Sequence, residues 1–393
     1  MWRNIASNAL TLFIVGLVVL AGVIAWGRSQ YSSAGPLETA ICLQVPAGGN
    51  MRGVSSDLAE QGAITSDTIF RVGADYSDKS SLLKAGSFLV PEQSSMAEIV
   101  DIITRGGAST CGTEVVFRIG VNATQVDVRE LDPATNRFRD VAEFVPGPEG
   151  EEGDAVPEEY TTVRNQNDTR YRVLVAEGTT VWRVVESLKL ADFIEGDLVE
   201  MPAEGMLAPD SYEVVAGSDV GALISRMEDA QAARLEESWR NRVDDLPFET
   251  KEDALIMASI IEKETGVAEE RRQVASVFEN RLKQGMRLQT DPTVIYGVTN
   301  GEGVLGRGLR QSELQRETPY NTYVINGMPP TPIANPGLAA IEAALDPAQT
   351  DYIFFVADGT GGHAFATTLA EHNANVALWR KIEAEKAAAE TAE

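Results

Sequence analysis

The segment with the clearest chemical signal is a helical stretch that carries two acids near its end, Glu262 and Glu264. On a helical wheel of about 100° per residue, Met257 and Ile261 share an apolar arc. Glu264 falls within that arc, whereas Glu262 lies on the opposite arc with Ser259. The sequence therefore predicts a solvated Glu262 and a partly desolvated Glu264.

Desolvation disfavours a charged carboxylate, so it raises the pKa of the carboxyl group. A carboxyl that stays protonated near neutral pH can act as a general acid. A purely structural interpretation is the alternative. In that interpretation Glu264 caps the helix end or pairs with Arg271, Arg272 or Arg281.

A hydrolase with two catalytic carboxylates would need a second acid about 5–10 Å away. Three acids in the same region are candidates, although spacing alone does not select one of them: Glu279, Asp291 and Glu317.

The region that follows Glu264 is rich in side chains that suit sugar recognition. Amides, hydroxyls and carboxylates hydrogen-bond to sugar hydroxyls, and tyrosines stack on pyranose faces. For each of these side chains a structural role, such as capping a turn or packing in the core, is the alternative. The candidates are Gln289, Thr290 and Asp291 on a predicted loop, Tyr296, Tyr320, Asn321, Tyr323, Asn335 and His363.

Composition excludes other kinds of chemistry. The 393 residues carry 33 Lys and Arg against 59 Asp and Glu, a net charge of −26, which argues against a nucleic-acid partner. Two Cys and two His are too few for a zinc ribbon or an HExxH site. No GxGxxG stands between a strand and a helix. We expect no metal and no cofactor.

The elements that would position these residues form an α+β region from about residue 249. Long polar loops between residues 288 and 337 separate its helices, and such loops often carry a site. Gly285 is a helix stop signal. The predicted elements are helices over Lys251–Thr265, Glu269–Gln284 and Leu338–Leu345, a buried strand over Tyr352–Val356, and a turn leading to His363–Ala366.

Residues 40–108 read as strand, helix, helix, strand and helix, the last over Met96–Thr104 and followed by Gly106-Gly107. A weak internal repeat is visible, because Leu43–Gly49 resembles Val173–Thr179. Each copy reads as a strand, a glycine turn and an amphipathic helix. A chance match is an equally good explanation.

Residues Ala9–Trp26 are 18 uncharged, mostly aliphatic residues, just enough for a helix to cross a bilayer. Trp2 and Trp26 flank them as interfacial anchors would. A cleaved signal peptide is the alternative, but Ala34-Gly35 is a poor cleavage site. We expect an uncleaved anchor with a cytoplasmic N-terminus and an extracytoplasmic body.

The only two cysteines, Cys42 and Cys111, flank predicted strands at Ile41–Val45 and Glu114–Ile119 that could be neighbours in one sheet. Outside the cytoplasm such a pair tends to form a disulfide. Two buried free thiols are the alternative. Further on, the acidic stretch Glu149–Glu159 is typical of a solvated loop, and Lys381–Glu393 of a frayed helix or tail.

Three long stretches resemble the endolytic murein transglycosylases, the YceG-like family. They are ASIIEKETGVAEERRQVASVFENRLKQGMRLQTDPTVIYG from Ala258 to Gly297, TPYNTYVINGMPPTPIANPG from Thr318 to Gly337, and DYIFFVADGTGGHAFATTLAEHN from Asp351 to Asn373. The family's catalytic glutamate is the second acid of its E-K-E-T motif, which is Glu264 here. The helical wheel singles out the same acid. Residues from about 113 to 165 are longer than the family's usual linker.

The resemblance implies a single-pass inner-membrane enzyme with its catalytic domain in the periplasm and a LysM-like module before that domain. It would cleave β-1,4 bonds between N-acetylmuramic acid and N-acetylglucosamine inside peptidoglycan strands, leaving 1,6-anhydro ends. It would thereby end the growth of new strands. Peptidoglycan synthases are the expected protein partners. A membrane-anchored glycan-binding or wall-synthase scaffold protein without chemistry is the alternative, as is a hydrolase variant.

The expected fold is thus α+β, with an N-terminal transmembrane helix, a small LysM-like βααβ module and an α+β catalytic domain. The expected parts are a cytoplasmic N-terminus at 1–8, a transmembrane helix at 9–26, a linker at 27–39, the LysM-like module at 40–112, a strand-rich insert with the acidic loop at 113–168, a second α/β subdomain at 169–248, the catalytic domain at 249–380 and a tail at 381–393.

Overall fold

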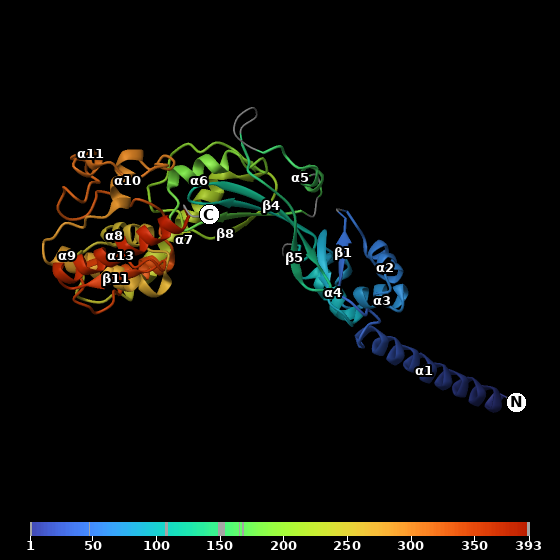
Figure 1. Cartoon of the computed structure of the whole chain (residues 1–393). Helices are drawn as coiled ribbons and strands as arrows, with labels where there is room; N and C mark the ends of the chain where they lie inside the picture. The colour runs from blue at the N-terminus through green and yellow to red at the C-terminus, as the bar shows by residue number, and fades with distance from the viewer. Residues whose placement is uncertain are drawn as a thin grey trace. The chain divides into compact units, whose positions relative to one another are not determined.

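A computed structural model describes residues 2–46, 48–106, 109–147, 154–164, 166 and 169–390, without the side chains of residues 2–9, 389 and 390. The chain divides into two compact units, which are described separately. The first unit contains residues 1–116, 127–144 and 155–171; the second contains residues 117–126, 145–154 and 172–393. Figure 1 shows the elements coloured along the chain.

The first unit begins with a long helix, α1 (Trp2–Ser32). Its stretch from Leu10 to Ser32 is long and apolar enough to cross a membrane, and none of that stretch is buried in the protein. A signal sequence near the N-terminus has the same properties, so the choice between anchor and signal peptide stays a prediction. The helix continues six residues past Trp26 into the predicted linker, because Tyr31 packs on the hydrophobic core that follows.

That core belongs to a strand–helix–helix–strand–helix segment, in the order that the sequence predicts. Strands β1 and β2 pair in antiparallel fashion, with Leu43 opposite Phe88. The helices cover this pair and bury Leu58, Phe70 and Ile99 completely. The elements are β1 (Ile41–Val45), α2 (Met51–Glu60), α3 (Asp67–Tyr76), the 3₁₀ turn η1 (Ser80–Leu82), β2 (Gly86–Val90) and α4 (Met96–Thr104).

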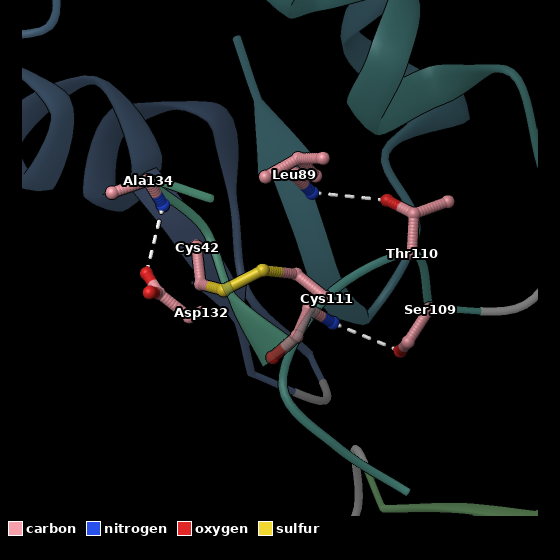
Figure 2. Close-up of a disulfide and its surroundings, with 8 residues drawn as sticks. Cys42, Leu89, Ser109, Thr110, Cys111, Asp132 and Ala134 are labelled. Carbon is pink, nitrogen blue, oxygen red and sulfur yellow. Dashed lines mark hydrogen bonds between the residues drawn. A yellow bond between two sulfur atoms is a disulfide. The ribbon is translucent and has the colours of Figure 1, made fainter. Parts of the chain in front are cut away.

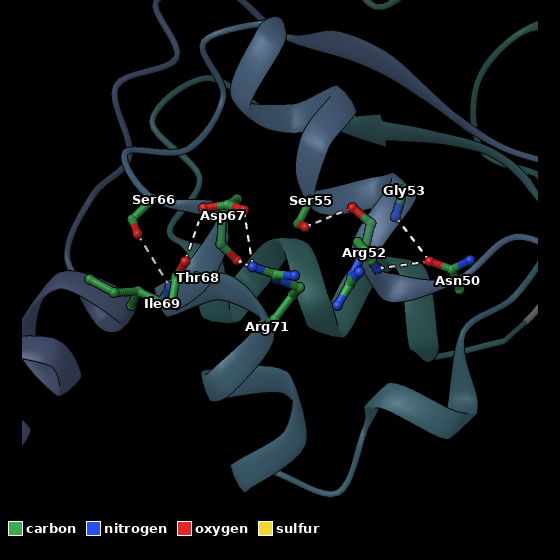
Figure 3. A network of polar contacts seen from close by, with 9 residues as sticks. All are labelled: Asn50, Arg52, Gly53, Ser55, Ser66, Asp67, Thr68, Ile69 and Arg71. Atoms are coloured by element: carbon green, nitrogen blue, oxygen red, sulfur yellow. Dashed lines mark hydrogen bonds and ion pairs between the residues drawn. The ribbon is translucent and has the colours of Figure 1, made fainter.

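Short polar side chains fix where these helices begin. The Asn50 side chain accepts hydrogen bonds from the backbone N–H groups of Arg52 and Gly53, and the Ser66 side chain accepts one from Ile69 (Figure 3). Ser95 and Glu98 form a capping box at the start of α4. Each cap satisfies amide groups that the helix leaves free.

Cys42 and Cys111 form a disulfide (Figure 2), which decides between the two alternatives that the sequence left open. The prediction that strands Ile41–Val45 and Glu114–Ile119 are sheet neighbours is wrong, because β1 pairs with β2. Cys111 lies close to Cys42 because the segment before β3 is hydrogen-bonded to β2. The backbone N–H of Cys111, like that of Thr110, donates to the carbonyl of Ser87 in β2, the strand next to β1.

A five-stranded sheet has the order β5-β4-β3-β6-β8. The boundary between the two units crosses strands β3, β4 and β6. Short strands β7 and β9 form a separate parallel pair. The elements are β3 (Thr113–Ile119), β4 (Thr124–Asp132), β5 (Arg137–Phe144), α5 (Glu158–Val163), β6 (Arg170–Val175), α6 (Val181–Leu188), β7 (Ile194–Glu195), β8 (Ser211–Val214) and β9 (Ser218–Asp219).

The two copies of the predicted repeat share their local structure. Gly48 and Gly178 both have left-handed backbone angles, with φ of 75° and 77°, which glycine adopts at no steric cost. A helix follows each turn, α2 in the first copy and α6 in the second. Of the predicted acidic loop, residues 149–153 lie outside the described residues, and α5 begins at Glu158.

The rest of the second unit is built around α8, which is buried at every position from Ala254 to Ile261. Helix α12 packs against it and starts and ends where the sequence predicts. Gly285 has a φ of 68° and follows α9, as its stop signal indicates. The helices are α7 (Val220–Arg240), α8 (Lys251–Glu264), the 3₁₀ turn η2 (Ala268–Glu270), α9 (Arg271–Lys283), α10 (Asp291–Thr299), α11 (Gln311–Leu314), α12 (Leu338–Leu345) and α13 (Leu369–Glu390).

Two details of this region differ from the prediction. Helices α10 and α11 lie within the stretch that was expected to be loop throughout. The expected strand forms over Phe354–Ala357 (β10) and pairs with β11 (His363–Ala366), but its phenylalanine side chains are half-buried, not buried. Residues 381–390 continue α13, in agreement with the helical alternative for Lys381–Glu393, and residues 391–393 lie outside the described residues.

Candidate active site around Glu264

Glu264 is the last residue of α8, and its side chain is partly covered by protein. One carboxylate oxygen accepts a hydrogen bond of 2.7 Å from the hydroxyl of Thr290. Burial raises the pKa of the Glu264 carboxyl above its usual value, and the negative charge of Asp291 acts in the same direction. The Thr290 hydroxyl, His363 and Arg281 offset part of that rise. The predicted desolvation of Glu264 is therefore confirmed.

The structural alternative for Glu264, an ion pair with an arginine, is not found among the described residues. Arg272 pairs with Asp346 at 2.7 Å. The buried Arg281 guanidinium donates instead to the backbone carbonyls of Leu288 and Ile353. The bond to Leu288 fixes the start of the loop that carries Thr290, and the bond to Ile353 fixes the segment before β10.

The prediction that Glu262 is solvated is wrong. Its carboxylate accepts a hydrogen bond of 2.9 Å from the backbone N–H of Gly337, at the start of α12. Burial raises the pKa of Glu262 as well, with a further contribution from Glu177. Ser259, expected on the same polar arc, is completely buried and accepts a bond from the backbone of Ile333. Helix α8 has no solvent-facing arc here because distant segments cover it.

The loop before α10 presents Gln289, Thr290 and Asp291 in three different ways. Gln289 is exposed and has a left-handed backbone with φ of 52°, which is uncommon outside glycine and often marks functional loops. Thr290 is buried, and its N–H donates to the hydroxyl of Thr322. Asp291 is exposed and begins α10. It accepts a hydrogen bond of 2.7 Å from the hydroxyl of Tyr323.

The tyrosine hydroxyls are engaged within the protein. Tyr296 and Tyr320 pack with ring centroids 4.9 Å apart. The Tyr296 hydroxyl donates to the carboxylate of Glu204, and the Tyr320 hydroxyl bonds to that of Thr331. Burial raises the pKa values of both Tyr296 and Tyr323. What these residues can offer a ligand is ring surface.

The side chains of Asn321 and Asn335 are both completely buried and have the structural role that the sequence analysis gave as the alternative. The Asn321 amide donates to three backbone carbonyls between Glu313 and Arg316, and its oxygen accepts from Tyr323 N–H. The Asn335 amide donates to Thr179 and accepts from Leu207. Their hydrogen-bonding groups hold backbone segments together.

His363, at the start of β11, is oriented by Glu270. Its Nδ1 lies 2.8 Å from one carboxylate oxygen of Glu270, and its backbone N–H donates to the other. The ring packs edge-on against Phe355. The His363 side chain is half-buried, and it lowers the pKa of the Glu264 carboxyl electrostatically.

The three candidates for a second carboxylate differ in their burial and in their electrostatic effect on Glu264. Asp291 acts electrostatically on Glu264, whereas Glu317 is exposed and absent from the charges acting there. Glu279 is completely buried in α9, and neither of its oxygens has a hydrogen-bond partner among the described residues. Among the described residues no three or more His, Cys, Asp or Glu side chains gather as a metal site would need.

Sequence reasoning missed two acids that organise the site. Glu204 is half-buried and accepts hydrogen bonds from Val181 N–H and the Tyr296 hydroxyl, and burial raises its pKa. Glu270 positions His363. Glu204 stands in no periodic or motif-like context, so no sequence signal could have identified it. Glu270 lies within the stretch Ala258–Gly297 that resembles the family, and that stretch was the one available signal.

Comparison with known proteins gives concordant matches. The chain matches the model of the YceG-like family over residues 43–378. It is 27% identical over 369 residues to the endolytic murein transglycosylase of Bacillus subtilis strain 168, which covers 91% of this chain and 89% of that protein. It is 26% identical over 344 residues to the endolytic murein transglycosylase of Streptococcus pneumoniae serotype 2 strain D39.

The pneumococcal alignment covers 86% of this chain and 58% of that relative, so the chain spans little more than half of its length. Among solved structures, a YceG-like protein from Listeria monocytogenes aligns with a TM-score of 0.44 and 23% sequence identity. That alignment covers 85% of this chain and 98% of the other.

Proposed function

The chain belongs to the YceG-like family, and from this membership we propose that it is an endolytic lytic transglycosylase of peptidoglycan. It cleaves β-1,4 bonds between N-acetylmuramic acid and N-acetylglucosamine within glycan strands. The curated relatives, which carry the name endolytic murein transglycosylase, support the substrate class. The single observation that carries the mechanism is the desolvated Glu264 carboxyl, hydrogen-bonded by Thr290.

In the proposed reaction, the protonated Glu264 gives its proton to the glycosidic oxygen, and the bond from that oxygen to the anomeric carbon breaks. The positive charge that develops at the anomeric carbon is stabilised by the 2-acetamido carbonyl of the muramic acid. Glu264, now a carboxylate, takes the proton from the 6-hydroxyl of the same sugar as that oxygen attacks the anomeric carbon. The product has a 1,6-anhydro ring, and Glu264 ends the cycle protonated.

Neighbouring groups fit this two-way proton transfer. A hydroxyl that donates to a carboxylate favours its ionised form, so Thr290 stabilises Glu264 after the first step and fixes its orientation. We assign sugar contacts to exposed Gln289 and Asp291, to the rings of Tyr296, Tyr320 and Tyr323, and to His363. Asn321 and Asn335 hold the loops that carry them.

The proposal extends to the rest of the chain. α1 anchors the protein in the inner membrane, with residues 1–8 in the cytoplasm and the catalytic domain in the periplasm. The segment at 40–112 is a LysM-like module that positions glycan, and 113–168 and 169–248 connect it to the catalytic domain at 249–380. Cleavage of new strands ends their elongation in coordination with peptidoglycan synthases.

The deciding experiment is product analysis on uncrosslinked glycan strands with the wild type and Glu264→Gln. Gln keeps the shape of the side chain but cannot transfer the proton, so we expect turnover to fall roughly 10²–10⁴-fold. Mass spectrometry should find 1,6-anhydro ends only with active protein. Glu252→Gln, an exposed acid at the start of the same helix, is the matched control and should retain full activity.

Two outcomes would contradict this function. Unchanged products with Glu264→Gln would favour a glycan-binding or scaffold protein without chemistry. Reducing ends in place of anhydro ends would favour hydrolysis, for which the neighbouring Asp291 supplies the second carboxylate.

A further inference from the structure

A pocket in the second unit is lined by the chain neighbours of Glu264 and Asp291. It is a pocket of about 280 Å³, to which α8 contributes Lys263, the residue before Glu264, and α10 contributes Pro292, the residue after Asp291. The β3–β4 turn, the start of α6 and the loop after α10 complete it. The lining residues are Val121, Asn122, Gly178, Thr180, Arg183, Lys263, Pro292, Ile295, Tyr296, Thr299, Gly301, Gly303, Val304, Leu305 and Ile333.

Two cations line this pocket without a carboxylate partner. Among the described residues, the Arg183 guanidinium makes no hydrogen bond or ion pair, and its Nε is buried without a partner. Lys263 donates to the carbonyl of Gly178 at 3.1 Å and forms no ion pair in the described part of the chain. A buried unpartnered guanidinium nitrogen is costly, and a bound anion would relieve that cost.

The acids nearest to these cations are engaged elsewhere. The two oxygens of Glu204 accept from Val181 N–H at 2.9 Å and from the Tyr296 hydroxyl at 3.2 Å. Glu262, which acts electrostatically on Lys263, accepts from the backbone of Gly337. The pocket is therefore a cationic site in a chain whose net charge is −26, with aliphatic walls from Ile295 and Ile333.

We propose that this pocket is a substrate subsite that binds a carboxylate on the lactyl arm of muramic acid, through the Arg183 guanidinium and the Lys263 ammonium. The proposal rests on the function proposed above and specifies which part of the glycan strand is read. An arginine fork binds a carboxylate through two parallel hydrogen bonds, and the aliphatic walls accommodate the carbon chain that carries the carboxylate.

Placement supports this occupant over an unrelated anion. The proposed cleavage occurs at a muramic acid, and that sugar carries the lactyl arm on the ring whose anomeric carbon reacts. Because Lys263 and Glu264 are adjacent in α8, a carboxylate held in the pocket would orient this sugar relative to the catalytic carboxyl. In peptide-bearing strands the carboxylates belong to the stem peptide, and in denuded strands the lactyl group itself is the carboxylate.

The test measures binding of glycan oligosaccharides to the full chain carrying Glu264→Gln, by calorimetry in detergent. The ligands are peptide-bearing strands, the same strands with their carboxylates converted to carboxamides, and denuded strands. We expect amidation to weaken binding roughly tenfold, because a charge-assisted hydrogen bond is lost. The additional substitution Arg183→Gln should lower the affinity for native strands by the same factor. It should not lower the affinity for amidated strands any further.

The control is Lys189→Gln, which removes one exposed positive charge at the end of the same helix and should leave binding unchanged. Arg183→Lys keeps the charge and should retain part of the affinity. Tighter binding of peptide-bearing strands would assign the carboxylate to the stem peptide, and tighter binding of denuded strands to the lactyl group.

The proposal is overturned if Arg183→Gln weakens the binding of native and amidated strands equally. It is also overturned if amidation does not change the affinity of the chain with intact Arg183. The second comparison uses no pocket variant and so holds even if Arg183→Gln fails to fold. If the wild type does not cleave glycan strands but binding still depends on their carboxylates, the proposed function is contradicted. The proposed subsite is supported by that result.

Discussion

At the scale of single residues, the environment of each acid in α8 decides its chemistry. Glu262 and Glu264 both have raised pKa values because both are partly buried, yet their partners differ. Glu262 is tied to the backbone of Gly337, where it holds the start of α12. Glu264 receives a side-chain hydroxyl from a loop with exposed polar neighbours. Desolvation alone would not distinguish them; the hydrogen-bond partner does.

Replacement of Thr290 by Val should move the alkaline limb of kcat/KM to higher pH. In the proposed mechanism, activity requires protonated Glu264, so it falls as the pH rises through the pKa of that carboxyl. The Thr290 hydroxyl favours the ionised form and lowers this pKa, and its removal raises the pKa further. Activity at neutral pH should fall by less than the roughly 10²-fold expected for Glu264→Gln. Thr290→Ser keeps the hydroxyl and should retain the wild-type profile; an unshifted limb in the Val variant would contradict the assigned hydrogen bond.

Glu279 offers a separate prediction about stability. Burial raises its pKa to about 8, with Lys283 lowering it and Asp245 raising it. Because the folded-state pKa lies above the unfolded value of 4.5, the folded state binds the proton more tightly. Its stabilising contribution is complete below about pH 4.5 and is lost as the pH rises towards 8.

The Glu279→Gln variant should therefore gain stability relative to wild type as the pH increases. Since each pKa unit corresponds to about 1.4 kcal/mol, the difference should grow by on the order of 3–5 kcal/mol between pH 5 and pH 8. Urea unfolding at both pH values measures it. The exposed acid Glu342 provides a control, since Glu342→Gln should show no such trend. A pH-independent difference for Glu279→Gln would refute the assignment.

At the scale of elements, buried amides and hydroxyls crosslink the loops around Glu264. The Thr322 hydroxyl accepts a hydrogen bond from Thr290 N–H. The Asn321 amide donates hydrogen bonds to three backbone carbonyls at the end of α11 and just after it. The loop before α10 is thereby fixed relative to α8. In the proposed mechanism this arrangement preorganises Thr290 at hydrogen-bond distance from Glu264.

The disulfide acts on the first unit alone. It joins β1 to the segment before β3 across 69 residues, and a loop of that length predicts about 4 kcal/mol of stabilisation in the chain-entropy treatment. Replacing both Cys42 and Cys111 by Ser should lower the denaturation midpoint of this unit and leave cleavage of soluble glycan unchanged. Adding reductant to wild type should reproduce the effect, and adding it to the double variant should do nothing. A loss of turnover in the folded double variant would contradict this separation.

At the scale of the whole molecule, α1 is set apart by composition. Residues Leu10 to Trp26 are exposed and, apart from Thr11, apolar, an arrangement that water disfavours and lipid accommodates. The body that follows carries the acids: residues 1–28 contain two bases and no acids, so the remainder has a net charge of −28.

Deletion of residues 1–28 should release the chain from the membrane fraction and leave cleavage of purified strands within about twofold of wild type. Glu264, Thr290 and the residues that line the proposed subsite all lie beyond residue 120, outside the deleted segment. Fractionation followed by a product assay measures both properties. Membrane association of the truncated chain would show that another part of the protein binds lipid.

The sequence by itself determined the elements whose signals are local. Helix α4 has the predicted limits because Ser95 and Glu98 form its capping box, and α12 ends where its apolar run ends. The β10–β11 hairpin follows from its glycine turn. Glu264 was identified by its place on the helix and by the family motif around it.

Only the tertiary structure decided what covers each residue, because burial comes from segments distant in sequence. Glu262 bonds to a residue 75 positions away, and Asn335 to one 128 positions away. A helical wheel contains no information about such partners, so it assigned α8 a polar arc that the fold buries. The Arg183–Lys263 pocket arose in the same way, since 80 residues separate two cations that meet only when the chain folds.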